Sequence, residues 1–164
     1  IADWPVISGA NDITLKNWVT TEKCFDFIKE NIKKVDTKMI IMTYYNIVYN
    51  YWVEKFVKYS KEIWVYGFII PDIPYDEKEW NELINLCKKY EIHLIQVVSP
   101  NTTNKRLKSI SSISSWFVYA ISKNMTTWSQ IKFWKDFEEL RLAFLLSGVI
   151  SVIELMLMDK TLFT

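Results

Sequence analysis

The chain alternates short apolar runs with longer segments in which apolar side chains recur every three or four positions. An apolar run of four to eight residues is typical of a strand buried on both faces, whereas the longer spacing is typical of a helix with one buried side. The runs predict strands at 38–43, 64–70, 92–99 and 116–122. The helical spacing predicts helices at 20–34, 52–61, 76–90, 103–113 and 129–141.

Local signals mark the ends of several of these elements. Thr20 or Thr21 can cap the first predicted helix, because a threonine oxygen accepts from the free backbone N–H groups of the first turn. Pro71 and Pro100 close the second and third predicted strands. The helix at 76–90 has acidic residues in its first turn and lysines in its last, which matches the helix dipole.

Strands that alternate with amphipathic helices predict βαβ units, with a parallel sheet covered by helices. A doubly wound sheet and a (β/α)8 barrel both fit this alternation. The chain has no GxGxxG or GxxxxGK[ST] motif that would favour a nucleotide-binding fold. Polar residues follow each strand, and in a barrel such loops gather on the face that carries the chemistry. Turns are polar in any case, so this pattern alone leaves both folds open.

Composition limits the classes of function. The 20 basic and 19 acidic side chains leave a net charge of +1, which argues against a dedicated nucleic-acid or anionic-membrane surface. Cys24 and Cys87 are isolated, so neither a metal site nor a disulfide framework is expected, and a reducing cytoplasm is the plain interpretation. The apolar tail at 142–158 contains Glu154 and is shorter than the roughly 20 residues of a membrane span. It predicts a buried strand that runs into a helix.

Four segments, in order, resemble the tryptophan synthase alpha chain family. They are IADWPVI, MTYYNIV, FIIPDIP and FVYAIS, where the family has approximately LADGPVI, MTYYNPV, LIIPDLP and GFVYxVS. The resemblance runs from residue 1 to about residue 140. It implies an α/β fold, a partial (β/α)8 TIM barrel. The chain at 1–164 is then an incomplete single domain that lacks the first strands and the last βα unit, with 142–164 poorly matched. Such a fragment is expected to be inactive and unstable by itself, because an open barrel leaves its edge strands unpaired.

The resemblance implies a lyase of tryptophan biosynthesis that cleaves indole-3-glycerol phosphate to indole and glyceraldehyde 3-phosphate by a retro-aldol reaction. The reaction needs a proton at indole C3, a base for a glycerol hydroxyl, and a carboxylate near the indole N–H, where positive charge builds. The resemblance gives this last role to Asp3, whereas its second catalytic group, a glutamate, lies upstream of this chain. Without the resemblance, Asp3 would equally be a helix cap or an Asx-turn residue.

The same resemblance implies three substrate-binding residues. Tyr44 and Tyr119 correspond to residues that line the indole pocket, although either could simply be a core aromatic. Thr127 corresponds to the threonine of a GVTG loop that closes over the substrate. Met125 and Thr126 depart from that loop motif, so the resemblance does not decide whether this loop closes. LSGVIS only faintly echoes the family's phosphate loop, so no phosphate-binding residue is assigned.

A partner protein is implied as well. The resemblance predicts an alpha2beta2 heterotetramer in which indole passes to the tryptophan synthase beta chain, with Asn46, Asp72 and Pro74 at the interface. Asn46 could equally be a turn former. Pyridoxal phosphate belongs to the beta chain, so no cofactor is expected in this chain. An alternative is a non-catalytic alpha-like subunit that docks on the beta chain and activates it, and the upstream glutamate would distinguish the two. A different phosphate-sugar isomerase or lyase barrel is a third possibility, which the ADxP match disfavours.

The glycine and tryptophan contents are unusual. The chain has 3 glycines and 8 tryptophans, whereas average usage predicts about 11 glycines. The resemblance aligns six tryptophans with family glycines: Trp4, Trp18, Trp52, Trp64, Trp116 and Trp128. Reading a UGA glycine codon as tryptophan would produce this pattern. The alternative is that these are genuine tryptophans packed as large core aromatics. Trp80 and Trp134 lie inside predicted helices and are expected to be genuine.

Overall fold

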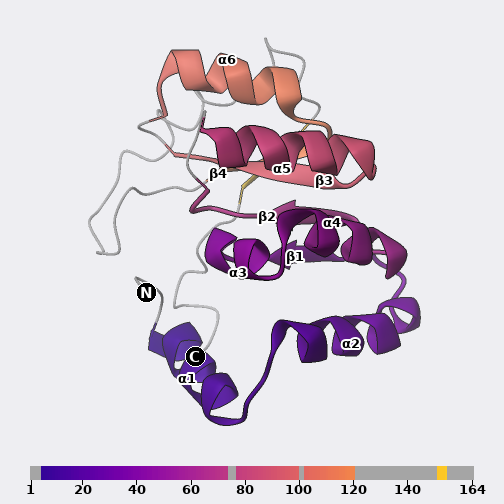
Figure 1. Ribbon diagram of the computed structural model, residues 1–164. Helices are drawn as coiled ribbons and strands as arrows, with labels where there is room; N and C mark the ends of the chain where they lie inside the picture. Colours follow the sequence, from indigo (N-terminus) through magenta and orange to yellow (C-terminus); the bar gives the residue numbers. More distant parts are fainter. Residues whose placement is uncertain (1–4, 74–76, 100–101, 121–150, 155–164) are drawn as a thin grey trace.

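A computed structural model of the chain describes residues 5–73, 77–99, 102–120 and 151–154 (Figure 1). Its helices are α1 (Pro5–Lys16), α2 (Thr21–Asn31), α3 (Tyr45–Asn50), α4 (Val53–Glu62), α5 (Lys78–Lys89) and α6 (Asn104–Ile113), with a short 3-10 helix, η1 (Ile32–Lys34). Its strands are β1 (Ile40–Met42), β2 (Gly67–Ile69), β3 (His93–Val98), β4 (Phe117–Ala120) and β5 (Ser151–Glu154).

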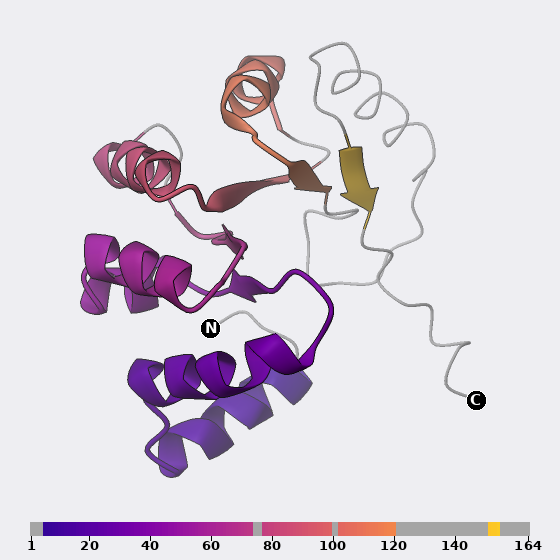
Figure 2. The same ribbon diagram turned by 90° about the vertical axis from the view of Figure 1, so that its right-hand side faces the viewer.

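The strands form one parallel sheet in the order β1-β2-β3-β4-β5, so strands that follow one another in sequence are neighbours in space. The register pairs Phe68 with Leu94, and Tyr119 with both Val97 and Ile153. Parallel neighbours need crossover connections, which α3 and α4, α5 and α6 supply. Figure 2 shows these helices on one side of the strands. A doubly wound sheet reverses its strand order and carries helices on both faces, so the described wall is that of a partial (β/α)8 barrel.

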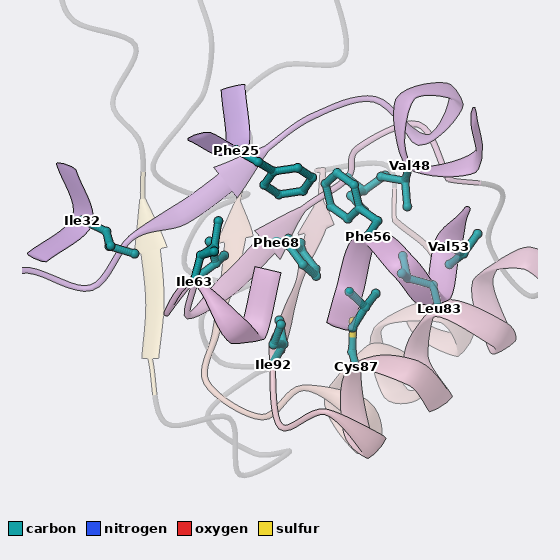
Figure 3. Close-up of a cluster of buried hydrophobic side chains, with 13 residues drawn as sticks. Phe25, Ile32, Val48, Val53, Phe56, Ile63, Phe68, Leu83, Cys87 and Ile92 are labelled. Atoms are coloured by element: carbon teal, nitrogen blue, oxygen red, sulfur yellow. The ribbon is translucent and has the colours of Figure 1, made fainter. Parts of the chain in front are cut away.

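The larger hydrophobic core lies between the strands and the helices. Phe68 on β2 is fully buried, and its ring centroid lies 5.3 Å from that of Phe56 on α4. The Phe56 ring in turn lies 5.1 Å from that of Phe25 on α2. Figure 3 shows these rings directed toward one another, with Leu83 and Cys87 of α5 completing the cluster. This core fixes the helices to the outer side of the wall.

A smaller cluster lies on the opposite face of the sheet. Successive strand residues point to opposite faces, and Ile69, Ile95 and Phe117 form this second group, with Val97 and Tyr119 packed against it. The inward-facing side chains of a barrel fill its interior. These residues therefore form an apolar inner wall.

The structure confirms the predicted helices and strands that it describes, mostly with shorter bounds, and Thr20 caps α2 by accepting from the Lys23 N–H at 3.4 Å. Three features differ from the predictions. Helix α1 was not predicted, although its first residue, Pro5, suits the first turn of a helix. Helix α3 occupies a segment expected to be a loop. Strand β1 is not buried on both faces, since Met42 is 60% exposed.

Two expectations concern the last part of the chain. The predicted helix at 129–141 lies outside the described residues. Within the apolar tail, Ser151–Glu154 forms β5 beside β4, which confirms the strand expected there.

Substituting alanine for Gly67 should destabilise the fold. A Cβ at Gly67 would lie 2.7 Å from Ile95 Cδ1 and 2.8 Å from the backbone oxygen of His93. The isoleucine can rotate away but the backbone oxygen cannot, so we expect the free energy of unfolding to fall by about 1–3 kcal/mol. Urea unfolding measures this. Alanine at Gly9, where a Cβ meets nothing within 4 Å, is the control, and equal effects at the two sites would contradict the packing at β2.

The two cysteines should react very differently. Cys24 is exposed, whereas Cys87 is buried, and burial raises the Cys87 pKa from 9.0 to about 12. At pH 8 we expect a thiol-alkylating reagent to label Cys24 readily and Cys87 only after denaturant is added, as peptide mass spectrometry would record. Because the folded pKa is raised, this thiol leaves stability unchanged below pH about 9 and lowers it as pH rises toward 12. Equal labelling rates in the folded protein would contradict this burial.

Candidate functional site

The loops that follow β1 and β2 meet at the carboxyl edge of the sheet. The Asp72 carboxylate Oδ1 accepts a hydrogen bond from the Tyr45 backbone N–H at 2.8 Å. Tyr45 is the first residue of α3, and its N–H has no partner within the helix. The preceding residue, Tyr44, provides no side-chain cap, so the carboxylate caps the helix from the neighbouring loop. Its negative charge also suits a helix N-terminus.

This hydrogen bond fixes the position of Tyr44. The Thr43 N–H donates to the Ile69 carbonyl at 3.1 Å, which extends the β1–β2 pairing to the edge of the sheet. Tyr44 follows directly and is half-buried. It is thus held between a strand pairing on one side and the capped helix on the other. A side chain held in this way is suited to line a binding site at the carboxyl edge.

Tyr119 occupies a different place, on the inner wall. It lies on β4 beside Val97 and packs, half-buried, against the cluster of Ile69, Ile95 and Phe117. The core-aromatic interpretation therefore describes its packing. That packing does not exclude pocket lining, because the inner wall of a barrel leads up to its carboxyl edge.

Local hydrogen bonds also join Ser99, at the end of β3, to Thr102, just before α6. The Ser99 N–H donates to Thr102 Oγ1 at 2.9 Å, and the Thr102 N–H donates to the Ser99 carbonyl at 2.9 Å. Thr103 then caps α6 by accepting from the Arg106 N–H at 3.3 Å. Thr102 is therefore held close to the end of β3 at the same edge.

The structure describes four of the seven predicted site residues. Asn46 and Asp72 are exposed, Asn46 in the first turn of α3 directly after Tyr44 and Asp72 in the loop that caps this helix, whereas Tyr119 lies on the inner wall. Three further predictions, Asp3, Pro74 and Thr127, lie outside the described residues. The roles of all seven stay predictions. The hydrogen bond from the Tyr45 N–H to Asp72 brings Tyr44, Asn46 and Asp72 together.

Sequence reasoning missed the capping role of Asp72. The residue directly before Tyr45 is not Ser, Thr, Asp or Asn, so a helix that begins there needs a cap from elsewhere in the chain. This was the one available signal. That helix was itself not predicted, so its missing cap could not be noticed. The carboxylate that fills this role lies 27 positions further along the chain.

Two side chains with shifted pKa values lie at opposite ends of the strands. At the carboxyl edge, burial raises the pKa of Tyr45, and the charges of Glu82 and Glu79 raise it further. Its hydroxyl therefore stays neutral in the physiological range. His93 lies at the amino end of β3, where its Nδ1 is 2.7 Å from Ser115 Oγ. Burial lowers the His93 pKa, and nearby lysines lower it further. This histidine lies at the end of the wall away from the candidate site.

Within the part of the chain that the structure describes, three or more His, Cys, Asp or Glu residues nowhere group in a way that could hold a metal ion. Among the same residues, every helix is too short or too polar to cross a membrane.

Comparisons with known proteins agree with this architecture. A family model described as tryptophan synthase alpha chain matches residues 1–142. The chain is 38% identical over 122 residues to the alpha chain of Petrotoga mobilis, covering 74% of this chain and 46% of that relative. It is 39% identical over 122 residues to the alpha chain of Methanococcus maripaludis, with the same two coverages, 74% and 46%. The chain thus spans about half the length of the curated relatives it matches.

A solved structure supports the same relationship. The tryptophan synthase A-subunit from Pyrococcus furiosus superposes with a TM-score of 0.77 at 27% identity, covering 94% of this chain and 61% of that one. The shared fold, the ordered motifs and the match over 1–142 identify this chain as a member of the tryptophan synthase alpha chain family.

Proposed function

We propose that the protein is a tryptophan synthase alpha-type lyase that cleaves indole-3-glycerol phosphate to indole and glyceraldehyde 3-phosphate. The observation that carries this proposal is the family match over 1–142, which includes all four motif segments in order. The hydrogen bond between Asp72 and Tyr45 supports it, because it ties two of those segments together at the edge where barrel enzymes place their chemistry.

The reaction breaks the bond between indole C3 and the adjacent carbon of the glycerol chain. That carbon's hydroxyl loses its proton and becomes the aldehyde, while C3 gains a proton and leaves as indole. Protonation at C3 develops positive charge on the indole nitrogen. We assign its stabilisation to the carboxylate of Asp3, and the proton transfers to the glutamate expected upstream.

The apolar inner wall suits the indole ring. Ile69, Ile95 and Phe117 present hydrocarbon and aromatic surface there, beside Tyr119. A flat apolar ring gains free energy when such surface is removed from water. Tyr44, held at the rim by the capped α3, would line the same pocket, and Thr127 would belong to the loop that closes over it.

The proposal includes a partner. Asn46 is exposed at the start of α3 and Asp72 in the loop that caps this helix, which supports a surface for the tryptophan synthase beta chain that extends to Pro74. Indole would pass to that chain, which would carry the pyridoxal phosphate, while this chain holds no cofactor. Both Cys24 and Cys87 are free thiols, which is compatible with a cytoplasmic alpha2beta2 complex.

A docking-only subunit is the second candidate, and one observation favours it. The sequence has Trp4 directly after Asp3, and an indole side chain there would fill space that the substrate needs. The protein would then activate the beta chain without cleaving substrate.

Growth complementation separates the two candidates. The gene, with its natural flanking sequence, is expressed together with its own beta chain in a bacterium that lacks a tryptophan synthase. The lyase predicts growth without tryptophan and without added indole. Growth only when indole is added would contradict the lyase and support the docking subunit. The beta chain expressed alone, with indole, provides the control.

A further inference from the structure

Two helices end with an exposed tryptophan in a backbone conformation that favours glycine. At the end of α1, the Val19 N–H donates to the Thr14 carbonyl at 3.0 Å. The Trp18 N–H donates to the Leu15 carbonyl at 3.1 Å, and Trp18 has φ 54°. This pair of bonds is the Schellman motif, in which the residue just past the helix adopts the left-handed conformation and is usually glycine.

The end of α4 repeats the arrangement. The Val65 N–H donates to the Ser60 carbonyl at 2.9 Å. The Trp64 N–H donates to the Lys61 carbonyl at 3.1 Å, and Trp64 has φ 73°. Val65 is 2% exposed, so the chain must turn sharply at Trp64 to bury the next residue. The positive φ is therefore required by the path from α4 into β2.

Trp52 lies in the sharp turn between α3 and α4. Its N–H donates to the Tyr49 carbonyl at 3.0 Å, and its own carbonyl accepts from the Phe56 N–H at 2.9 Å. Its dihedral angles are φ 69° and ψ 111°. This ψ lies outside even the small left-handed helical region open to other residues. Of the three turns, this one most strongly demands a residue without a Cβ.

The indole rings do not gain enough contact to offset this strain. Trp18, Trp52 and Trp64 are 82%, 77% and 71% exposed. A positive φ brings Cβ close to the following carbonyl oxygen, and for a bulky residue it is a genuine outlier. A buried aromatic could compensate through packing, but these three rings lie largely in water. They combine an unfavourable backbone with little burial.

Trp80 and Trp116 provide the contrast. Trp80 lies inside α5, is 6% exposed, and its Nε1 donates to Gln96 Oε1 at 3.4 Å. Trp116 is half-buried and packs against Tyr66 and Phe117, with ring centroids 4.7 and 4.8 Å apart, and it is absent from the residues with positive φ. Among the tryptophans that the structure describes, those that strain the backbone are therefore the ones that lack burial.

We propose that the natural protein carries glycine at positions 18, 52 and 64 and tryptophan at position 80. The codon at the first three positions would be UGA, read in the source organism by a tRNA charged with glycine. The chain has 3 glycines and 8 tryptophans. A gene with UGA glycine codons would give this imbalance if its sequence were translated with UGA as tryptophan. The inference rests on backbone geometry and exposure, and it stands whether or not the protein is a lyase.

Peptide mass spectrometry of the natural protein, isolated from its source, tests the proposal directly. We expect glycine at 18, 52 and 64 and tryptophan at 80 within the same digest. Tryptophan at the first three positions would overturn the proposal. Glycine at position 80 as well would overturn the structural distinction on which it rests, because Trp80 is buried and hydrogen-bonded.

A stability measurement provides a second, independent test. Its parent is the full-length protein produced with tryptophan at positions 18, 52 and 64. Changing W18G, W52G and W64G together should raise the folding equilibrium constant by about fivefold or more per site, because each change relieves a left-handed strain. W80G should lower it. A triple variant that is no more stable than its parent would show that the indole rings stabilise the turns, and would contradict the proposal.

Glu91 offers a matched control for the conformation itself. It ends α5 in the same Schellman motif, with φ 54° and the Ile92 N–H donating to the Cys87 carbonyl at 2.9 Å. E91G should therefore also stabilise, although it removes an exposed ion pair with Lys61 that contributes little. A gain at Glu91 without a gain at the three tryptophans would count against glycine at those positions.

Discussion

Replacing Asp3 by asparagine should lower kcat for indole-3-glycerol phosphate cleavage by about 10²–10³-fold in the natural protein with its beta chain. Asparagine keeps the size of the side chain and its capacity to hydrogen-bond, but it removes the charge that stabilises the developing cation on the indole nitrogen. Because that cation forms in the transition state, kcat should fall more than KM rises. Steady-state measurement of indole release gives both parameters.

The control is Asp12→Asn, which removes the same charge from an exposed position on α1 and should leave both parameters unchanged. A kcat within twofold of the parent in the Asp3 variant would mean that Asp3 only caps a turn. The transition-state role would then have to be withdrawn, while the family relationship would stand.

Replacing Phe68 by alanine should lower the free energy of unfolding by about 3–5 kcal/mol. Phe68 is fully buried, and its ring lies at the centre of the cluster in Figure 3, 5.3 Å from the ring of Phe56. The change removes an aromatic ring and leaves a cavity between β2 and α4. A loss of this size is a large part of the roughly 5–15 kcal/mol that stabilises a typical domain.

Urea unfolding of the natural protein measures this loss. Phe27 on α2 offers a matched control, because the same substitution there removes a ring that is 68% exposed. We expect the control to change stability by less than about 0.5 kcal/mol. Similar losses at the two positions would contradict the placement of the core between the sheet and the helices.

Periodicity predicted most of the described fold because each strand and helix here carries its own local signal. The run 92–99 became β3 and the amphipathic segment 76–90 became α5, since burial in a covered parallel sheet requires that pattern. Helix α3 escaped prediction because it is only six residues long and its cap comes from Asp72 in another loop. No sequence window contains both parts of that interaction.

The candidate site was predicted less completely, for the same physical reason. The resemblance selected Tyr44 and Asp72, but only the folded chain brings the two loops together and shows the carboxylate capping the helix that follows Tyr44. The packing of Tyr119 on the inner wall depends on strand register, which pairs it with Val97. Register is a property of the sheet, so the sequence of β4 alone could not supply it.

The tryptophans show what backbone geometry adds to a sequence pattern. The resemblance marked six positions without distinguishing among them. The structure describes four of these, and positive φ supports glycine at Trp18, Trp52 and Trp64 but gives no such reason at Trp116. The other two, Trp4 and Trp128, lie outside the described residues, so only their codons can show whether these positions are glycine or tryptophan.

A product assay with indole-3-glycerol phosphate tests the lyase activity most directly. The natural protein, decoded as in its source and combined with its beta chain in the absence of serine, is incubated with the substrate, and both products are measured. We expect indole and glyceraldehyde 3-phosphate in equal amounts, at a rate that depends on Asp3. A folded protein that binds the beta chain yet releases neither product would contradict the lyase and leave the docking subunit as the function.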